Sequence, residues 1–187
     1  MSTNKVKYGL KNVHYAVATE TGGTLTYATP VPIPGGVSIT LEPKGEKAEF
    51  YADDGLYFSV ESNQGYEGSL EMALMPDAFR IAVLGDRLDK NEGLFEDVNA
   101  RPKPIALLFE FNGDVNATRY VLYYVHVRRP ALTGTTTAAA VEVGTETLNL
   151  MASPAPGTGF VKAKLQAGKT GYNNFFTAVY TFVPLTP

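Results

Sequence analysis

The stretch EKAEFYADDGLYFSVE, at residues 46–61, constrains the fold of this chain more than any other. Its two halves alternate like β-strands, and the Asp54-Gly55 pair between them is typical of a hairpin tip, where the backbone needs positive φ. Apolar and aromatic side chains occupy both sets of alternating positions: Ala48, Phe50, Leu56, Phe58 and Val60 on one, and Tyr51 and Tyr57 among charges on the other. Such a ribbon is hard to bury on both faces within one domain, which raises the question of what covers its second face.

Alternation also dominates the rest of the chain. The segments GVSITLEP and YEGSLEMAL read as half-buried strands, and the second alternates Tyr66, Leu70, Met72 and Leu74 with Glu67, Ser69 and Glu71. The segment PIALLFEFNGD followed by TRYVLYYVHVRR predicts a second hairpin that turns near Asn112-Gly113-Asp114. Three more strands are predicted in ETLNLMASP, GFVKAKLQAG and NNFFTAVYTFVP. With 18 Gly and 12 Pro to form turns, the sequence predicts eight to ten short strands and a mainly β fold.

One short helix is predicted, at about residues 76–85. Pro76 suits the first turn, Asp77 lies beside the positive end of the helix, and Gly85 suits its end. Phe79, Ala82 and Val83 follow the spacing of one helix face, so this side is expected to pack against a sheet.

Length and composition favour one domain that spans residues 1–187, since 187 residues suffice for a sizeable core and no linker divides the chain. There is no cysteine, which excludes disulfides and thiolate chemistry. The first twenty residues lack the apolar core of a secretion signal and no run could span a membrane, so the protein is expected to fold where it is made, without a membrane partner. The net charge of −3 argues against a protein that grips nucleic acid.

The sequence offers little for catalysis, and we expect a protein that is not an enzyme and has no cofactor and no metal. His14 and His126 are the only histidines and lie far apart. The segment AGKTG lacks the first glycine of a phosphate-binding loop and has no helix after it. Glu67 and Glu71 could do acid–base work in principle, but a solvated polar strand face explains them better.

The opening segment NKVKYGLKNVHYAVATE resembles the major tail proteins, or tail tube proteins, of long-tailed bacteriophages, particularly the phi13-type family. The likeness continues through TYATPVPIPGGVSITLEPKGEKAEFYADDG and, in the order of elements, through most of the chain; from TGTTTAAAVEVG onward no motif can be matched. The resemblance implies two packed antiparallel sheets, in a sandwich or barrel-like arrangement, with one flanking helix and a long hairpin, here at about residues 42–61, that projects from the body.

The same resemblance implies a structural role. Subunits of the family form hexameric rings, the rings stack, and strands of neighbouring subunits join into one barrel that lines a tube for DNA. The partners would be further copies of this chain together with tape-measure and tail-end proteins, and the location would be the tail of a virion assembled in the cytoplasm of the bacterial host. An acidic wall suits this role, because like charge keeps the passing DNA from binding.

Two sets of residues are predicted to serve assembly and the channel. The first comprises the predicted inter-subunit residues of the hairpin: Glu46, Lys47, Glu49, Tyr51, Asp53, Asp54, Gly55 and Tyr57. The second comprises the candidate residues of the lumen face: Glu67, Ser69, Glu71, Glu142 and Glu146. For each single lumen candidate, an ordinary outward-facing polar residue is the competing interpretation.

Two other functions are compatible with the sequence. A tube subunit of a contractile or secretion-type injection machine would share the fold and the rings. A monomeric β-sandwich that binds carbohydrate would use exposed tyrosines for stacking, although the absence of Trp and of a secretion signal counts against it. Among the classes of function, a hydrolytic enzyme comes third, after a structural protein and a binding module.

Overall fold

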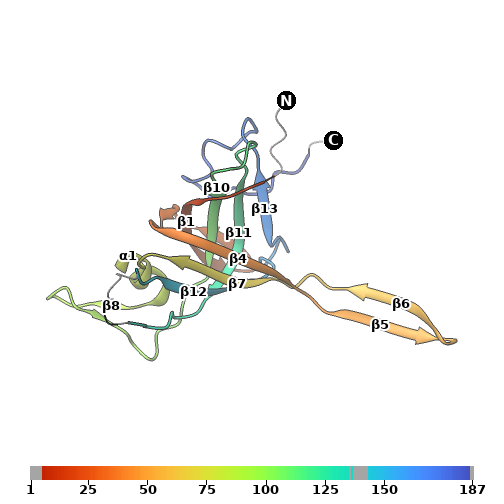
Figure 1. Ribbon diagram of the computed structural model, residues 1–187, viewed down its shortest axis with the longest axis horizontal. Coiled ribbons are helices and arrows are strands. Elements are labelled where there is room, and N and C mark those ends of the chain that lie inside the picture. The colour runs from red at the N-terminus through yellow and green to blue at the C-terminus, as the bar shows by residue number, and fades with distance from the viewer. Residues whose placement is uncertain (1–5, 135, 137–142, 186–187) are drawn as a thin grey trace.

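The computed structural model describes residues 6–134, 136 and 143–185, and these form a mainly β body with one long arm (Figure 1). Thirteen strands lie in the described residues, and ten of them are longer than two residues, in agreement with the expected eight to ten. The strands are β1 (Leu10–Thr21), β2 (Thr24–Tyr27), β3 (Val31–Pro32), β4 (Gly36–Lys44), β5 (Lys47–Ala52), β6 (Gly55–Glu61), β7 (Gly65–Met72), β8 (Arg87–Leu88), β9 (Leu94–Phe95), β10 (Ile105–Phe111), β11 (Arg119–Val127), β12 (Glu146–Ala152) and β13 (Lys162–Leu165).

Nine of these strands form one antiparallel sheet in the order β2-β1-β10-β11-β12-β7-β4, with β13 paired to β11 and β3 to β1. Strand β11 carries the sheet from one layer to the other, because its first half pairs with β13 and its last residues pair with β12. Figure 1 shows β10, β11 and β13 standing upright while β4, β7 and β12 run across them. The predicted fold class is confirmed, and its two packed layers are parts of one continuous curled sheet.

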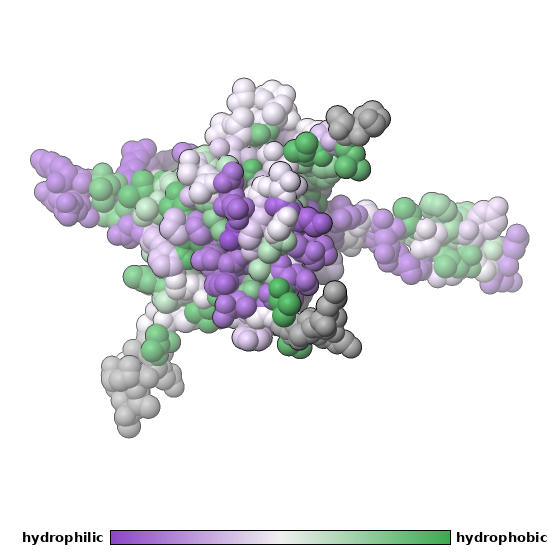
Figure 2. All heavy atoms as spheres, turned by 90° about the horizontal axis from the view of Figure 1, so that it is seen from above, coloured by the Kyte–Doolittle hydropathy of each residue, from purple (hydrophilic) through white to green (hydrophobic). Residues whose placement is uncertain are grey.

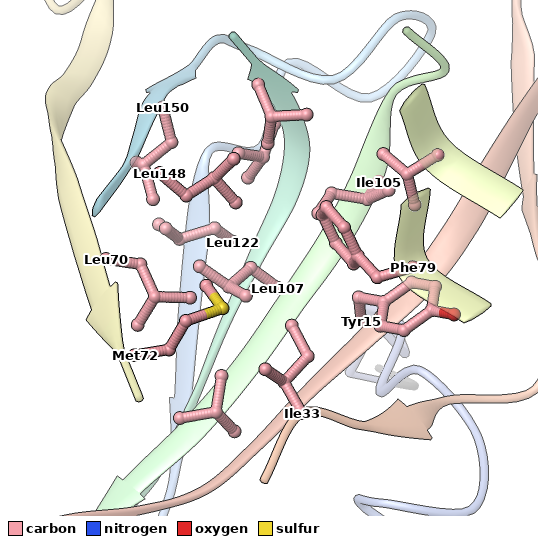
Figure 3. Packing of buried hydrophobic residues seen from close by; sticks show 14 of the residues in the cluster. Tyr15, Ile33, Leu70, Met72, Phe79, Ile105, Leu107, Leu122, Leu148 and Leu150 are labelled. Atoms are coloured by element: carbon pink, nitrogen blue, oxygen red, sulfur yellow. The ribbon is translucent and has the colours of Figure 1, made fainter. Parts of the chain in front are cut away.

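The main core fills the space between the two layers. Leu70 and Met72 of β7 are fully buried, and Leu148 of β12 lies directly opposite Leu70. Leu107 and Leu122 from β10 and β11 complete the facing side, as Figure 3 shows. The alternation in YEGSLEMAL predicted that Leu70 and Met72 share one strand face, since every second residue of a strand points to the same side. Leu74, assigned to the same face, follows the end of β7 and is exposed.

The predicted helix is present. It begins as α1 (Asp77–Phe79), directly after Pro76, and continues as one wider turn, η1 (Arg80–Leu84). Gly85 ends it with a left-handed φ of 82°. Phe79 is fully buried and meets the ring of Tyr15 edge-on at 4.9 Å, so the helix closes one end of the core.

The prediction of a last strand in NNFFTAVYTFVP is wrong. Residues 171–178 form successive turns, with Phe175 N–H donating to the Tyr172 carbonyl and Thr177 N–H donating to the Asn174 carbonyl. The segment lies over the outer face of β10 and β11, where Phe175 is fully buried beside Leu108 and Val121. Strand β10 is therefore buried on both faces, which explains its apolar run from Ile105 to Phe109.

Arg119 of β11 holds this covering segment in place. Its guanidinium lies 3.9 Å from the centre of the Tyr172 ring and 4.6 Å from that of Phe176. On its other side, Arg119 Nε donates to the buried carboxylate of Glu110 at 3.0 Å. The charge is thus paired and stacked where it leaves water, which keeps the desolvation cost low.

Candidate assembly surface

The arm is the hairpin of β5 and β6, which continues β4 and β7 beyond the edge of the body (Figure 1). Two hydrogen bonds connect it to the sheet, from Gln64 N–H to the Lys44 carbonyl at 2.8 Å and from Ser62 N–H to the Glu46 carbonyl at 2.9 Å. Every residue of β5 and β6 is exposed apart from the partly buried Ala52. The body therefore leaves both faces of this hairpin open to solvent.

The hairpin tip differs by one residue from the prediction. Asp53 and Asp54 have positive φ angles of 51° and 59°, and Ala52 pairs with Gly55 across the turn. The two-residue turn is thus Asp53-Asp54, while Gly55 begins β6. Two consecutive left-handed residues match the twist of the strands they join, and Asp tolerates this conformation better than most residues.

A β-bulge sorts the side chains of the hairpin into two unlike faces. Phe50 pairs with Phe58 and Ala48 pairs with Val60, so these four share one face, called here the apolar face. The register shifts between Phe50 and Tyr51, and Tyr51 then lies opposite Leu56.

Leu56 therefore leaves the apolar set to which the sequence assigned it, because Tyr57 is the extra residue of the bulge. The Tyr57 ring meets Phe50 edge-on at 6.4 Å. The exposed fractions of Phe50 and Phe58 are 59% and 57%, which is unusual for phenylalanine, and no other described part of the chain covers the apolar face.

The opposite face of the hairpin is polar apart from Leu56, and three of its polar side chains pair with one another. The predicted residues Lys47, Glu49 and Tyr51 meet here, where Lys47 forms an ion pair with Glu49 and the Tyr51 hydroxyl donates to Glu49 Oε2 at 2.8 Å. Lys47 and Tyr51 together lower the pKa of Glu49, and Glu49 raises the pKa of Tyr51. Glu46 lies apart at the base, where its backbone N–H donates a hydrogen bond to Ser62 Oγ at 3.0 Å.

Sequence reasoning chose the polar residues of the hairpin and left Phe50 and Phe58 out of the predicted contact set. Their alternation was visible, but it did not distinguish residues that pack on their own body from residues that face solvent. Exposure in the folded chain is the signal that identifies them.

Three of the predicted lumen residues lie together on the outer face of β7. Glu67, Ser69 and Glu71 point away from the core, since the residues between them face it or approach the neighbouring backbone. Their cross-strand neighbours extend this polar surface: Ser38, Thr40 and Glu42 on β4, and Thr147, Asn149 and Met151 on β12. A shallow hollow in it continues to His126 and Arg128. The surface carries no aromatic side chain on β4, β7 or β12.

The assignment of Glu146 to the lumen face is wrong, because its side chain does not belong to this polar surface. It pairs with Met72 and so lies on the core side of β12. One of its carboxylate oxygens accepts a hydrogen bond from Met75 N–H at 2.7 Å, and the other lies 3.3 Å from Arg80. Its role is to fix the start of the helix against the sheet. The remaining candidate, Glu142, lies outside the described residues.

Glu71 is held as a carboxylate by two hydroxyl groups. Thr145 donates to Glu71 Oε1 at 2.7 Å and Ser38 donates to Oε2 at 2.9 Å, and these hydrogen bonds lower the pKa of Glu71 below its ordinary 4.5. The bonds tie β4 to the loop before β12 across the outer face of β7.

Replacing Thr145 by Val and Ser38 by Ala is expected to raise the pKa of Glu71 towards 4.5, because the carboxylate then loses both donors. A folded-state pKa below the unfolded value adds stability above pH 4.5, and this contribution disappears as the pH falls through the folded pKa. The substituted protein should therefore lose less stability than the unsubstituted one on acidification below pH 4.5. Carboxyl NMR titration measures the pKa, and an unchanged value would contradict the hydrogen-bond assignment.

Nothing in the described residues points to metal chemistry or to a membrane-spanning helix. In these ranges no group of three or more His, Asp or Glu side chains gathers as it would around a metal ion. No helix of the described chain has the length and apolar character needed to cross a membrane. His14 stacks on Phe176, and His126 meets Tyr124 edge-on, so both histidines have structural ring contacts.

Comparison with known proteins shows the fold. No protein-family model matches the chain, and no curated protein matches it either. Among solved structures, the fold is similar to that of a chain in the cryo-EM structure of the anti-feeding prophage (AFP) baseplate, 6-fold symmetrised. The TM-score is 0.51 at 14% identity, and the match covers 90% of this chain and 100% of that chain. At this identity the likeness shows a shared fold, and the phi13-type resemblance stays a prediction.

Proposed function

We propose that this protein is a non-enzymatic structural subunit of a bacteriophage tail tube. Copies would form hexameric rings, and the stacked rings would make the conduit through which DNA leaves the virion. The observation that carries the proposal is the hairpin of β5 and β6, whose apolar face is left uncovered by the residues that the structure describes. Exposed aromatic residues that gather on one face of a projecting hairpin are typical of a contact with another protein.

Two further features support self-assembly. The outer edge of β4 has no paired strand within the described residues, so it can accept a strand from outside. The hairpin leaves one side of the body only, so it can reach a different surface on the next copy. Contacts between two unlike surfaces close into rings or continue along an axis. The fold is also found in a chain of a six-fold symmetrised particle, which supports a ring of six.

The polar outer face around Glu67, Ser69 and Glu71 suits the wall of the channel. It combines carboxylates and hydroxyl groups with Arg128 and no exposed aromatic platform, so it offers DNA neither a strongly basic track nor stacking surfaces. A surface of this kind lets DNA pass without holding it.

A subunit of a phage-derived injection machine is the second candidate. It is favoured by the solved structure with the shared fold, which comes from a prophage baseplate. The neighbouring genes separate the two candidates: a sheath gene favours a contractile machine, and a tape-measure gene without a sheath favours a flexible tail.

Negative-stain microscopy of the purified protein, together with sedimentation over a range of concentrations, tests the proposal. Rings or tubes are expected, and their mass should be a multiple of six subunits. A compact monomer at the highest concentration that binds a glycan would instead identify a carbohydrate-binding module. Hydrolytic activity in a broad substrate screen would contradict the structural role.

Reversing the charges on the outer face of β7 tests the channel assignment. The double substitution Glu67→Lys with Glu71→Lys should leave ring formation intact, while DNA delivery by reconstituted particles falls about tenfold or more, because the wall then attracts phosphates. The matched control Glu92→Lys changes a charge on the exposed loop between β8 and β9 and should deliver normally. Normal delivery by the double variant would show that another face lines the channel.

A further inference from the structure

An apolar groove opens on the body between β4 and the strands β10 and β11. One wall is formed by Val37, Ile39 and Leu41 of β4, and the floor and the other wall by Phe109, Phe111 and Tyr120. The three aromatic rings contact one another, with Phe109 stacked on Tyr120 at 5.5 Å. The groove is thus a rigid apolar surface that reaches solvent.

The groove exists because the curled sheet does not close. Strands β1 and β4 approach each other at Gly36, where an added Cβ would lie 2.9 Å from Val13 Cγ2. No ladder of hydrogen bonds joins them within the described residues, and β4 pairs on one side only, with β7. The unpaired edge of β4 therefore runs along the groove and can accept a strand.

Two lysines stand at the rim of the groove without a carboxylate in ion-pair distance among the described residues. Lys7 lies 4.8 Å from the centre of the Phe111 ring, and Lys162 lies 4.3 Å from that of Tyr66, to whose hydroxyl it also donates. Lys7 acts on Asp114 only through a longer-range attraction. The groove thus combines an apolar floor with a basic rim.

The hairpin has the complementary features. Its apolar face carries Phe50 and Phe58, and its tip carries Asp53 and Asp54, which form no ion pair within the described chain. Figure 2 shows the arm on the right, with hydrophobic residues along its middle and hydrophilic ones at its base and at its end. Its outer edges are unpaired as well, since β5 and β6 pair only with each other in the part of the chain that the structure describes.

We propose that the hairpin of one copy docks into this groove of a second copy, with the apolar face on the aromatic floor, one hairpin edge beside β4 and the acidic tip at the two lysines. The inference deepens the proposed self-assembly and rests on it. A copy cannot fill its own groove in this structure, because its hairpin extends away from the body with both faces in solvent (Figure 1). The site is incomplete without a partner copy.

Cysteine cross-linking tests the docking directly, because the chain contains no cysteine. Copies with Phe58→Cys are mixed with copies that carry Val37→Cys in the groove, and the mixture is oxidised under assembly conditions. A disulfide-linked dimer is expected. Two matched controls move one partner to the opposite strand face: Ser59→Cys on the hairpin and Thr40→Cys on β4. Each control should give at least about tenfold less dimer, because its thiol points away from the contact.

Exchanging the charges of the hairpin tip and the groove rim tests the docking independently. Asp53→Lys with Asp54→Lys should lower the cross-linking yield about tenfold or more, and so should Lys7→Glu with Lys162→Glu, because like charges then meet. The chain with all four substitutions should recover the yield. Retained melting temperatures establish that each variant is folded.

The outcomes separate the docking from the proposed function. Particles that assemble while the yield stays at the control level would overturn the groove as the acceptor and leave self-assembly standing. A second experiment removes residues 1–5 and measures the binding of an added hairpin peptide. If the peptide binds the groove only after this removal, residues 1–5 are its occupant, and the docking of a second copy is overturned. A protein that stays monomeric with no cross-link would contradict both.

Discussion

Replacing Lys47–Glu61 by an Asn-Gly turn is expected to abolish assembly while the body stays folded. Glu46 and Ser62 are already hydrogen-bonded at the base of the arm, so a two-residue turn can join them without strain. No fully buried residue lies in the removed segment, so the melting temperature should change by no more than about 3 °C. Two aromatic anchors are lost, and association should weaken more than about 100-fold, since central aromatic contacts are each worth about 2 kcal/mol or more.

Sedimentation and electron microscopy measure this effect. The matched control is Ser59→Ala, which changes the polar face of the same hairpin and should assemble normally. Particles of normal size from the shortened chain would refute the role of the arm in assembly. An unfolded shortened chain would show that the body needs the arm in order to fold.

Phe175→Ala is expected to have the largest effect on stability. The ring is fully buried beneath the turns of the C-terminal segment and stacks with Tyr180 at 6.0 Å. Truncating a buried phenylalanine costs about 3–5 kcal/mol, which lowers the melting temperature of a chain of this length by roughly 6–20 °C.

The control is Phe182→Ala in the same segment, where the side chain is 62% exposed and its loss should cost less than about 1 kcal/mol. Thermal or denaturant unfolding compares the two variants. Equal effects would mean that the C-terminal segment does not cover the sheet as a packed layer.

Sequence reasoning was most successful where one face of an element is buried. The alternation in β7 predicted Leu70 and Met72 inside and Glu67, Ser69 and Glu71 outside. It did so because successive residues of a strand point to opposite faces, and here one face is buried. The helix was predicted from its start at Pro76 and its end at Gly85, since both signals are local.

The wrong predictions concern interruptions of the regular period. The bulge in the hairpin shifts Leu56 to the other face, and alternation alone cannot reveal an extra residue. Phe175 and its neighbours have the composition of a strand, yet they form successive turns over the outer face of β10, where Phe175 is buried without being part of a strand. Glu146 was assigned by polarity, although its carboxylate is needed on the core side to hold the helix start.

The fluorescence of a Phe50→Trp variant tests the central claim most directly, namely that a second copy covers the apolar face of the hairpin. The chain has no natural tryptophan, so the new residue is the only indole and reports on this face alone. The emission maximum should shift to shorter wavelength over the same concentration range in which sedimentation detects assembly. Emission typical of an indole in water, retained while the particles form, would contradict the account.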